Sequence, residues 1–222
     1  VIFADKTGTL TQNRMRVARL AWPGCDEDIS WETDERPDSP PGLACRLLEV
    51  AALCTNAELD EETGTPNSGA EGTDAGDRPK GTGDPMEIAL LHAAAAVDIR
   101  RGQLLEEHRE VREVSFDSET KMMATFHEAE SGYRVAVKGA PEAVLEIATH
   151  VASSEGEAQT LSDQGRDEWA ERVEALAEQG YRVLAFAERQ VDSPDDDPYA
   201  DLTLLGLVGL ADPPRDDVAD AI

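Results

Sequence analysis

Three short apolar segments follow one another in the middle of the chain, separated by turns of hairpin length. They span residues 111–116, 122–127 and 133–138, and the turn between the last two, residues 128–132, contains a glycine. Strands joined by such turns pair antiparallel, because a parallel pair needs a crossover of about a dozen residues or more. The pattern therefore favours an antiparallel sheet in the middle of the chain.

Helical and further strand patterns lie on both sides of these segments. Apolar residues at helical spacing predict helices, one with Pro141 as its first residue and one with Ser162 as its N-cap. The expected helices span residues 42–59, 85–101, 141–151 and 162–179. Further strands are expected at residues 14–20, 182–189 and 202–210, and loops at residues 22–41, 60–83 and 192–201. An antiparallel sheet flanked by helices predicts the α+β class.

The first residues of the chain differ from this pattern. Residues 1–4 are mostly apolar and lead directly into Asp5 and a polar segment. A bare apolar strand followed by a polar loop is typical of a parallel α/β sheet, where ligands bind beyond the carboxyl ends of the strands. This segment therefore predicts a strand of a different kind of sheet.

Composition narrows the possible partners. The 222 residues carry a formal net charge of −27, which argues against nucleic acids and anionic membranes as partners because both need a positive face. Apolar residues make up 40%, enough for a packed core, but no apolar run approaches the roughly 20 residues of a membrane-spanning helix. The three cysteines are an odd number without a signal peptide, which suggests free thiols in a reducing compartment. The cysteines have no C-x-x-C spacing and the four histidines are scattered, so we expect no structural zinc site. An anionic ligand would need a local basic pocket in this acidic protein.

The segment after the first strand has the residues for phosphoryl transfer. A strand-end carboxylate such as Asp5 can attack a phosphoryl group and form an aspartyl phosphate. Gly8 lets the backbone approach the phosphate, Thr7 supplies a hydroxyl, and Lys6 offers a positive charge. Mg²⁺ would bridge carboxylate and phosphate, since this reaction depends mainly on positioning and charge neutralisation.

The string Asp-Lys-Thr-Gly-Thr-Leu-Thr at residues 5–11 resembles the phosphorylation motif of P-type ATPases, ion pumps that form an aspartyl phosphate from ATP. The resemblance continues over nearly the whole chain, through segments at residues 83–87, 116–121, 138–142 and 212–215. The Lys-Gly-Ala-Pro-Glu and Asp-Pro-Pro-Arg segments are most similar to the calcium, sodium-potassium and proton pump branches.

The resemblance implies a role for each matching residue. Adenine stacks on Phe116, with Glu87 and Lys121 at the adenine end of the pocket, and Lys138 and Arg182 steer the phosphates toward Asp5. Asp5 is the phosphate acceptor and holds Mg²⁺ together with Thr7. The implied catalytic residues are Asp5, Lys6 and Thr7, and the implied nucleotide-binding residues are Glu87, Phe116, Lys121, Lys138, Gly139, Arg182, Asp212 and Arg215. Ser118 and Thr120 depart from the family pattern, which often has an arginine at the latter position.

The resemblance also implies how the chain is divided. Residues 14–209 would form the nucleotide-binding domain, residues 1–13 an N-terminal remnant of the phosphorylation domain, and residues 210–222 the hinge and the return to that domain. ATP, Mg²⁺ and the rest of a cation pump are the implied partners, and the location is the cytoplasmic side of a membrane protein. The chain taken alone is expected to be monomeric and to bind ATP without phosphorylating itself.

Two alternatives remain open. Haloacid-dehalogenase-type phosphatases also use a strand-end aspartate, but their motif is Asp-x-Asp-Gly-Thr. In this sequence Thr7 occupies the position of the second aspartate, so the general acid/base of those enzymes is missing. The acidic segments 26–38 and 192–201 could instead dock a basic protein in a non-enzymatic interaction module. A Walker-type nucleotide site is disfavoured because the sequence has no G-x-x-x-x-G-K-[ST] string.

Overall fold

The computed structural model describes residues 14–25, 29–30, 42–60, 81–153 and 157–213. Residues 1–4, which were expected to form a strand, lie outside this part of the chain. The helices are α1 (Gly42–Leu53), α2 (Pro85–Ala95), α3 (Arg101–Glu107), α4 (Pro141–Ile147) and α5 (Asp163–Glu178). The longer strands are β1 (Arg16–Ala21), β5 (Glu110–Asp117), β6 (Met122–Glu128), β7 (Tyr133–Gly139), β8 (Ala148–Val151), β10 (Arg182–Val191) and β11 (Leu202–Ala211). Two-residue strands are β2 (Ile29–Ser30), β3 (Glu58–Leu59), β4 (Gly81–Thr82) and β9 (Gln159–Thr160).

One sheet organises the described residues, and its main strands are antiparallel. Its strand order is β2-β1-β11-β10-β7-β6-β5, and β8 and β9 extend it beside β11. The pairing of β8 with β11 is parallel, so the sheet is mixed at this one place. The expectation of an α+β domain with an antiparallel sheet flanked by helices is confirmed.

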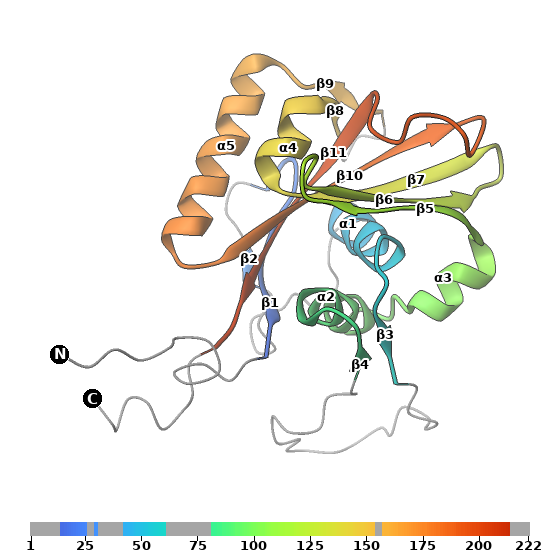
Figure 1. Ribbon diagram of the computed structural model, residues 1–222. Coiled ribbons are helices and arrows are strands. Elements are labelled where there is room, and N and C mark those ends of the chain that lie inside the picture. The colour runs from blue at the N-terminus through green and yellow to red at the C-terminus, as the bar shows by residue number, and fades with distance from the viewer. Residues whose placement is uncertain (1–13, 26–28, 31–41, 61–80, 154–156, 214–222) are drawn as a thin grey trace.

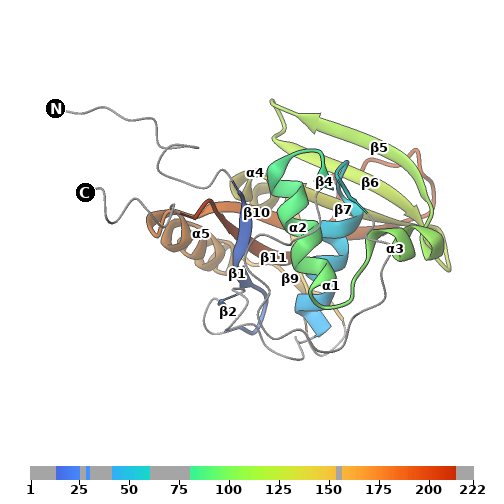
Figure 2. The same ribbon diagram turned by 90° about the horizontal axis from the view of Figure 1, so that it is seen from below.

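The two faces of the sheet bury separate apolar cores, because side chains alternate along each strand. In Figure 1, α1 and α2 cover the lower face and α4 and α5 the upper one, and Figure 2 shows α1 and α2 running side by side beneath the sheet. Met123 and Phe186 belong to the core under α1 and α2. Met122 and Ala185, their chain neighbours, belong to the core under α4 and α5.

Three of the expected helices end too late, for reasons that the structure gives. The helix expected at 42–59 ends at Leu53, where the Thr55 hydroxyl accepts the Ala57 N–H at 3.2 Å and closes a local turn. The helix expected at 85–101 ends at Ala95, and Asp98 in the left-handed conformation (φ 62°) separates it from α3.

The third correction lies at residues 141–151. Pro141 does occupy the first turn of α4, but the helix ends at Ile147 and residues 148–151 form β8. The partner strand β11 decides this, since its Leu202 and Leu204 pair with Ala148 and Val151. Sequence periodicity alone does not register such a distant pairing.

The N-cap expected at Ser162 is confirmed, because its hydroxyl accepts the Gly165 N–H at 3.1 Å. Helix α5 follows it with Trp169 and Leu176 on its buried side. None of the described helices combines the length and the apolar character that crossing a bilayer requires.

Candidate functional site

The matched residues that the structure describes gather at one end of the sheet and on α2. In an antiparallel sheet the end of one strand lies beside the beginning of the next. Phe116 is near the end of β5, Lys121 precedes β6, Lys138 and Gly139 end β7, Arg182 begins β10, and Asp212 follows β11. Positions that are far apart in the sequence therefore lie at the same end of the sheet. Asp5, Lys6, Thr7 and Arg215 lie outside the described residues.

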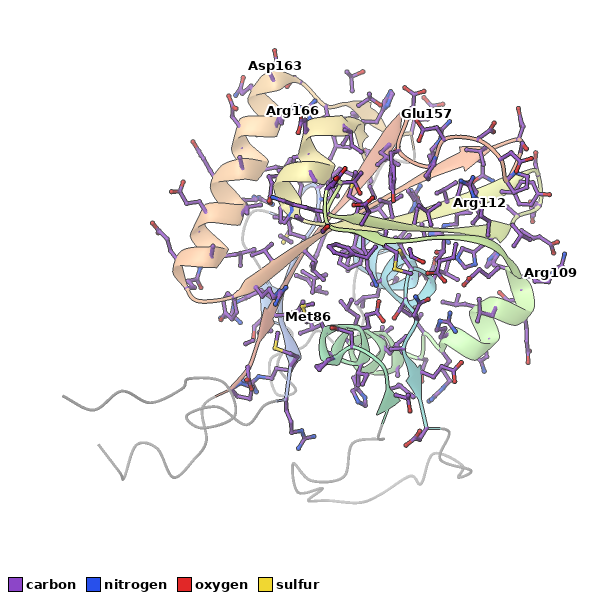
Figure 3. All side chains as sticks on the ribbon, viewed as in Figure 1. Met86, Arg109, Arg112, Glu157, Asp163 and Arg166 are labelled. Atoms are coloured by element: carbon purple, nitrogen blue, oxygen red, sulfur yellow. The ribbon has the colours of Figure 1, made fainter. Side chains whose placement is uncertain are left out.

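Tight packing fixes the start of α2. Gly83 has φ +130°, and a Cβ there would lie 2.7 Å from the Cα of Ala57, so only glycine fits. Asp84 then caps the helix, its Oδ1 accepting the Met86 N–H at 2.8 Å, and Pro85 fills the first helical position. Figure 3 marks Met86 at this helix start. The next residue, Glu87, is thereby held in the first turn.

Glu87 forms an ion pair with Lys138 of β7. The Lys138 ammonium contacts Glu87 Oε1, and the two side chains are only 10% and 14% exposed. Removing either partner would leave a partly buried charge without compensation. The lysine that was expected to steer phosphates thus points toward α2 in this structure.

The other oxygen of Glu87 also has a partner. Its Oε2 accepts the backbone N–H of Asn56 at 3.2 Å, from the segment that follows α1. The side-chain amide of Asn56 donates to Glu113 Oε1 of β5 at 3.0 Å, and the Ser115 hydroxyl donates to the same oxygen at 2.7 Å. These two donors and the charge of Lys138 lower the pKa of Glu113, so it remains ionised near neutral pH.

Phe116 stands out among the described residues as a large apolar side chain that is 63% exposed. It lies on β5 opposite the start of β6, and Met123 of β6 pairs with Lys138 of β7. An aromatic ring held in solvent two strands away from a lysine offers a flat surface on which a planar ligand can stack.

Lys121 has an unusual backbone. Its φ is +56°, a conformation that few non-glycine residues adopt, and its Nζ lies 2.8 Å from Glu142 Oε1 of α4. This contact raises the pKa of Lys121 and lowers that of Glu142, so both are charged. The neighbouring Gly139 leaves no room for a side chain, since a Cβ would lie 2.8 Å from the Lys121 carbonyl oxygen.

Arg182 and Asp212 extend the same end of the sheet toward β11. Arg182 is exposed and pairs with Leu210, beyond the point where Gly139 of β7 pairs with Ala185. Asp212 Oδ1 accepts the Arg14 N–H at 3.0 Å, across 198 residues of sequence. The described segment thus begins and ends side by side.

A buried polar chain on β6 links the sheet to α1. The His127 ring lies with Nδ1 3.2 Å from the His108 carbonyl oxygen and Nε2 2.8 Å from Thr125 Oγ1. Burial lowers the pKa of His127 to about 4, so the ring is neutral, and Nδ1 donates its one proton to that carbonyl. Thr125 Oγ1 also lies 3.3 Å from the Leu53 carbonyl oxygen at the end of α1.

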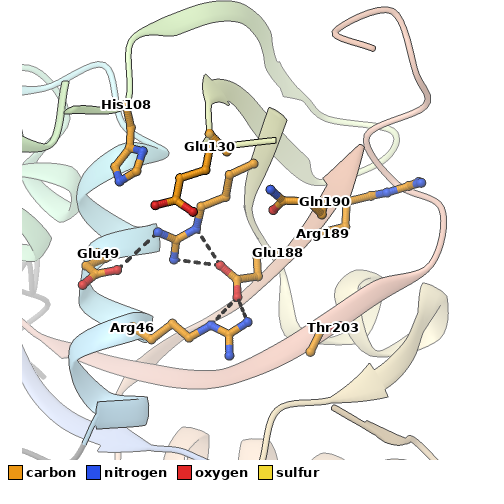
Figure 4. Close-up of a pocket in the computed structure, with 10 residues that line it drawn as sticks. Arg46, Glu49, His108, Glu130, Glu188, Arg189, Gln190 and Thr203 are labelled. Carbon is orange, nitrogen blue, oxygen red and sulfur yellow. Dashed lines mark hydrogen bonds and ion pairs between the residues drawn. The ribbon is translucent and has the colours of Figure 1, made fainter. Parts of the chain in front are cut away.

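A hollow of about 740 Å³ lies at the opposite end of β7 (Figure 4). In it the nearly buried Glu188 joins Arg46 of α1 to Arg134 of β7, and Arg134 also contacts Glu49 at 3.2 Å. Opposite charges are matched within this network, so it ties α1 to the sheet and leaves no excess charge for a ligand. The residues expected to bind nucleotide do not line it.

No group of three His, Cys, Asp or Glu side chains that could hold a metal ion occurs in the part of the chain that the structure describes. The positions expected to hold Mg²⁺, Asp5 and Thr7, are outside that part. The described site therefore offers an exposed aromatic surface, an exposed arginine and two lysines that are each paired with a carboxylate, Lys138 with Glu87 and Lys121 with Glu142. The ring suits a planar ligand, and an anionic ligand must compete with these carboxylates for the lysines.

Sequence reasoning missed Asn56, Glu113 and Ser115. Asn56 is a single polar residue directly after α1, and its partners are 31 and 57 residues away, so no local pattern indicates it. Glu142 lies within the matched segment 138–142, but the resemblance implies no role for it, and the structure shows it as the partner of Lys121.

Comparison with known proteins identifies the same family as the sequence motifs. A family model described as "P-type ATPase, cytoplasmic domain N" matches residues 44–217. All of the chain aligns at 32% identity with 23% of the Calcium-transporting ATPase 1 of Bacillus cereus. It aligns at 33% identity with 22% of the Sodium/potassium-transporting ATPase subunit alpha of Hydra vulgaris, and at 30% with 25% of the Calcium-transporting ATPase of Bacillus subtilis. The chain thus spans about a quarter of the length of these curated relatives.

Proposed function

The chain belongs to the P-type ATPases as a cytoplasmic domain N, and from this premise we propose that it binds ATP for a cation-transporting pump. In the intact pump the bound ATP gives its γ-phosphate to Asp5, which becomes an aspartyl phosphate. The main observation in support is that four residues lie together at one end of the sheet and beside α2, namely Phe116, Lys121, Lys138 and Arg182. This places basic groups and an exposed ring together in a chain of net charge −27.

Each side chain has a role that suits its surroundings. Phe116 stacks on adenine. The two lysines exchange the roles that the resemblance implies for them. Lys138, which was expected at the phosphates, is paired with Glu87 and lies at the adenine end of the site. Lys121, which was expected at the adenine end, is more exposed and meets the phosphates together with Arg182, while Gly139 keeps the strand close to Lys121.

The residues outside the described part complete the proposal. Asp5 is the phosphate acceptor and Lys6 a nearby charge, and Mg²⁺ is held by Asp5 and Thr7, whose oxygen atoms are ligands that this cation prefers. The oxygen donors fit the metal by their chemistry. Asp212 and Arg215 belong to the hinge that returns to the phosphorylation domain.

The proposed domain limits follow the same scheme. Residues 14–209 form the nucleotide-binding domain, residues 1–13 are an N-terminal remnant of the phosphorylation domain, and residues 210–222 are the hinge and the return to it. Strand β11 reaches Ala211, so the hinge begins within the last residues of that strand. The Arg14–Asp212 hydrogen bond supports this division, because a domain inserted into another must enter and leave at one place. The partners are the other parts of the pump, and the domain lies on the cytoplasmic side of the membrane.

An ATP titration of the isotope-labelled 222-residue chain, followed by NMR to millimolar ATP, tests the proposal. A dissociation constant near 1 mM corresponds to about 4 kcal/mol of binding free energy. Saturable shifts at Phe116, Lys121 and Lys138 are expected, and Phe116→Ala should abolish them. Absence of saturable shifts in the unsubstituted chain would refute ATP binding.

Arg109→Ala is a matched control for the cations of the site. Like Lys121, Arg109 is an exposed cation with one carboxylate partner, Glu128. It lies at the other end of β5, beside α3 (Figure 3). Its replacement should leave the ATP titration unchanged, whereas Lys121→Ala should weaken it.

A further inference from the structure

The carboxylate of Glu87 has a fixed orientation. One oxygen contacts the Lys138 ammonium, and the other accepts the Asn56 N–H at 3.2 Å. Each carboxylate oxygen has two lone pairs, so Glu87 can still accept from a ligand, but only in the directions that these two contacts leave open. The position of the Asn56 backbone therefore decides where a ligand donor must lie.

Asn56 is itself held from two sides. Its side-chain amide donates to Glu113 Oε1 of β5 at 3.0 Å. The next residue, Ala57, is buried beneath Gly83, and its N–H donates to Thr55 Oγ1 at 3.2 Å. The segment after α1 is thus connected to β5 by the Asn56 side chain and to the start of α2 by packing.

The acceptor of the Asn56 amide is charged. Hydrogen bonds from Ser115 and Asn56 lower the pKa of Glu113, and hydrogen bonds to an ionised acceptor are stronger than those between neutral groups. Without the Asn56 amide, Glu113 would keep Ser115 as a donor, but the segment would lose its link to β5.

We propose that Asn56 is a positioning residue that sets the base selectivity of the nucleotide site by fixing the carboxylate of Glu87. The inference rests on the proposed ATP binding. Adenine carries an amino group where guanine carries a carbonyl oxygen. A fixed carboxylate accepts a hydrogen bond from the amino group and repels the carbonyl oxygen, so it favours adenine. A carboxylate that can turn discriminates less.

The test compares the dissociation constants of ATP and GTP, without Mg²⁺, for the 222-residue chain and for Asn56→Ala. The unsubstituted chain is expected to prefer ATP. Asn56→Ala should reduce the ratio of the two constants about three- to tenfold, the range that one hydrogen bond accounts for. A purely structural role for Asn56 would lower the melting temperature and leave the ratio unchanged, and that result would overturn the inference.

Gln164→Ala is the matched control. Gln164 is an exposed amide that donates to a carboxylate, Glu168, at 2.9 Å on α5, away from the site. Its replacement should change neither the ratio nor the ATP affinity. A chain that binds neither ATP nor GTP would instead refute the proposed function, which is a distinguishable outcome.

Glu113→Ala provides a second route if Asn56→Ala does not fold. Glu113 is exposed on β5, so its removal leaves the core intact and deletes the acceptor that the Asn56 amide shares with the Ser115 hydroxyl. The selectivity ratio should fall as in Asn56→Ala, and the double variant should fall no further than either single one. An unchanged ratio in folded Glu113→Ala would contradict the inference.

Discussion

At the scale of one residue, the backbone of Lys121 opposes the conformational preference of its side chain type. Its φ of +56° suits glycine, yet the position holds a lysine whose ammonium contacts Glu142. Strain of this kind persists where a side chain is needed for another purpose, and phosphate binding supplies that purpose in the proposed site.

Lys121→Gly should separate the two effects. The melting temperature is expected to stay the same or rise, because glycine adopts this backbone without strain, while ATP binding should weaken about tenfold with the loss of one charged contact. Thermal unfolding and an ATP titration of the same sample measure both.

Asp98→Gly serves as the control for that variant. Asp98 has φ 62° and follows the C-terminal end of α2, a helix roughly 16 Å long that begins after Asp84. It should show the same response in melting temperature with no change in ATP affinity. Equal loss of ATP binding in both variants would mean that Lys121 acts only through the backbone.

His127 gives a prediction about pH. Its pKa falls from 6.5 to about 4 on folding because of burial, so between these values the unfolded chain binds more protons than the folded one. The contribution to stability is complete above pH 6.5 and is lost as the pH falls toward 4, by at most about 3 kcal/mol.

Urea unfolding at pH 7 and pH 5 measures this contribution. Carboxylates titrate in the same range, so the comparison is with His127→Gln, whose free energy of unfolding should fall less on acidification than that of the unsubstituted chain. An NMR titration should show the His127 ring neutral down to about pH 4. Protonation of this ring near pH 6.5 in the folded chain would contradict the prediction.

At the scale of elements, the close packing of β11 against β1 depends on one glycine. Gly206 has φ +149°, and a Cβ there would lie 2.1 Å from the Ala21 carbonyl oxygen of β1. The register between β10 and β11 shifts at the same place, so the position is a β-bulge.

Gly206→Ala should destabilise the fold by about 2 kcal/mol or more, since backbone atoms cannot move aside as a flexible side chain can. Gly102→Ala in α3 is the control, because a Cβ there meets nothing within 4 Å. It should leave stability unchanged or raise it by about 0.5–1 kcal/mol. Urea unfolding measures the stability of both variants. Equal stabilities would show that β1 can move away from the added methyl group without cost.

The elements that could be predicted are those whose signals are local. The hairpins of β5, β6 and β7 follow from short apolar segments and turns, and α5 follows from Ser162 and its apolar side. Residues 148–151 were misassigned because their conformation depends on β11, about 50 residues later in the sequence.

In the candidate site, too, the residues with a local sequence motif could be predicted, and the contacts between distant residues could not. Glu87, Phe116 and Lys138 could be named from segments that resemble a known family, and their gathering follows from the antiparallel strand order. The ion pair of Glu87 with Lys138 and the link through Asn56 to Glu113 join residues that no local pattern relates, so only the folded chain could give them.

At the scale of the whole molecule, the net charge of −27 opposes the compact state through repulsion among like charges. Raising NaCl from about 0.05 M to about 1 M shortens the screening length from roughly 14 Å to roughly 3 Å. The melting temperature should therefore rise with salt. KCl should give the same increase as NaCl, which distinguishes screening from binding of one ion. A fall in melting temperature would mean that ion pairs such as Lys138–Glu87 outweigh the repulsion.

The hydrogen bond between Arg14 and Asp212 closes 198 residues of chain into one contact. The entropy lost in closing a flexible loop grows with the logarithm of its length. Here the packing within the domain already offsets that entropy cost, because the domain folds with its two ends together. To any segments that flank the domain, the folded unit behaves as a connection of turn length. Contacts between those segments then have a low effective contact order, although they are distant in sequence. In the proposed division, a phosphorylation domain can consequently fold around the inserted unit at nearly the rate of an uninterrupted chain, once that unit has folded.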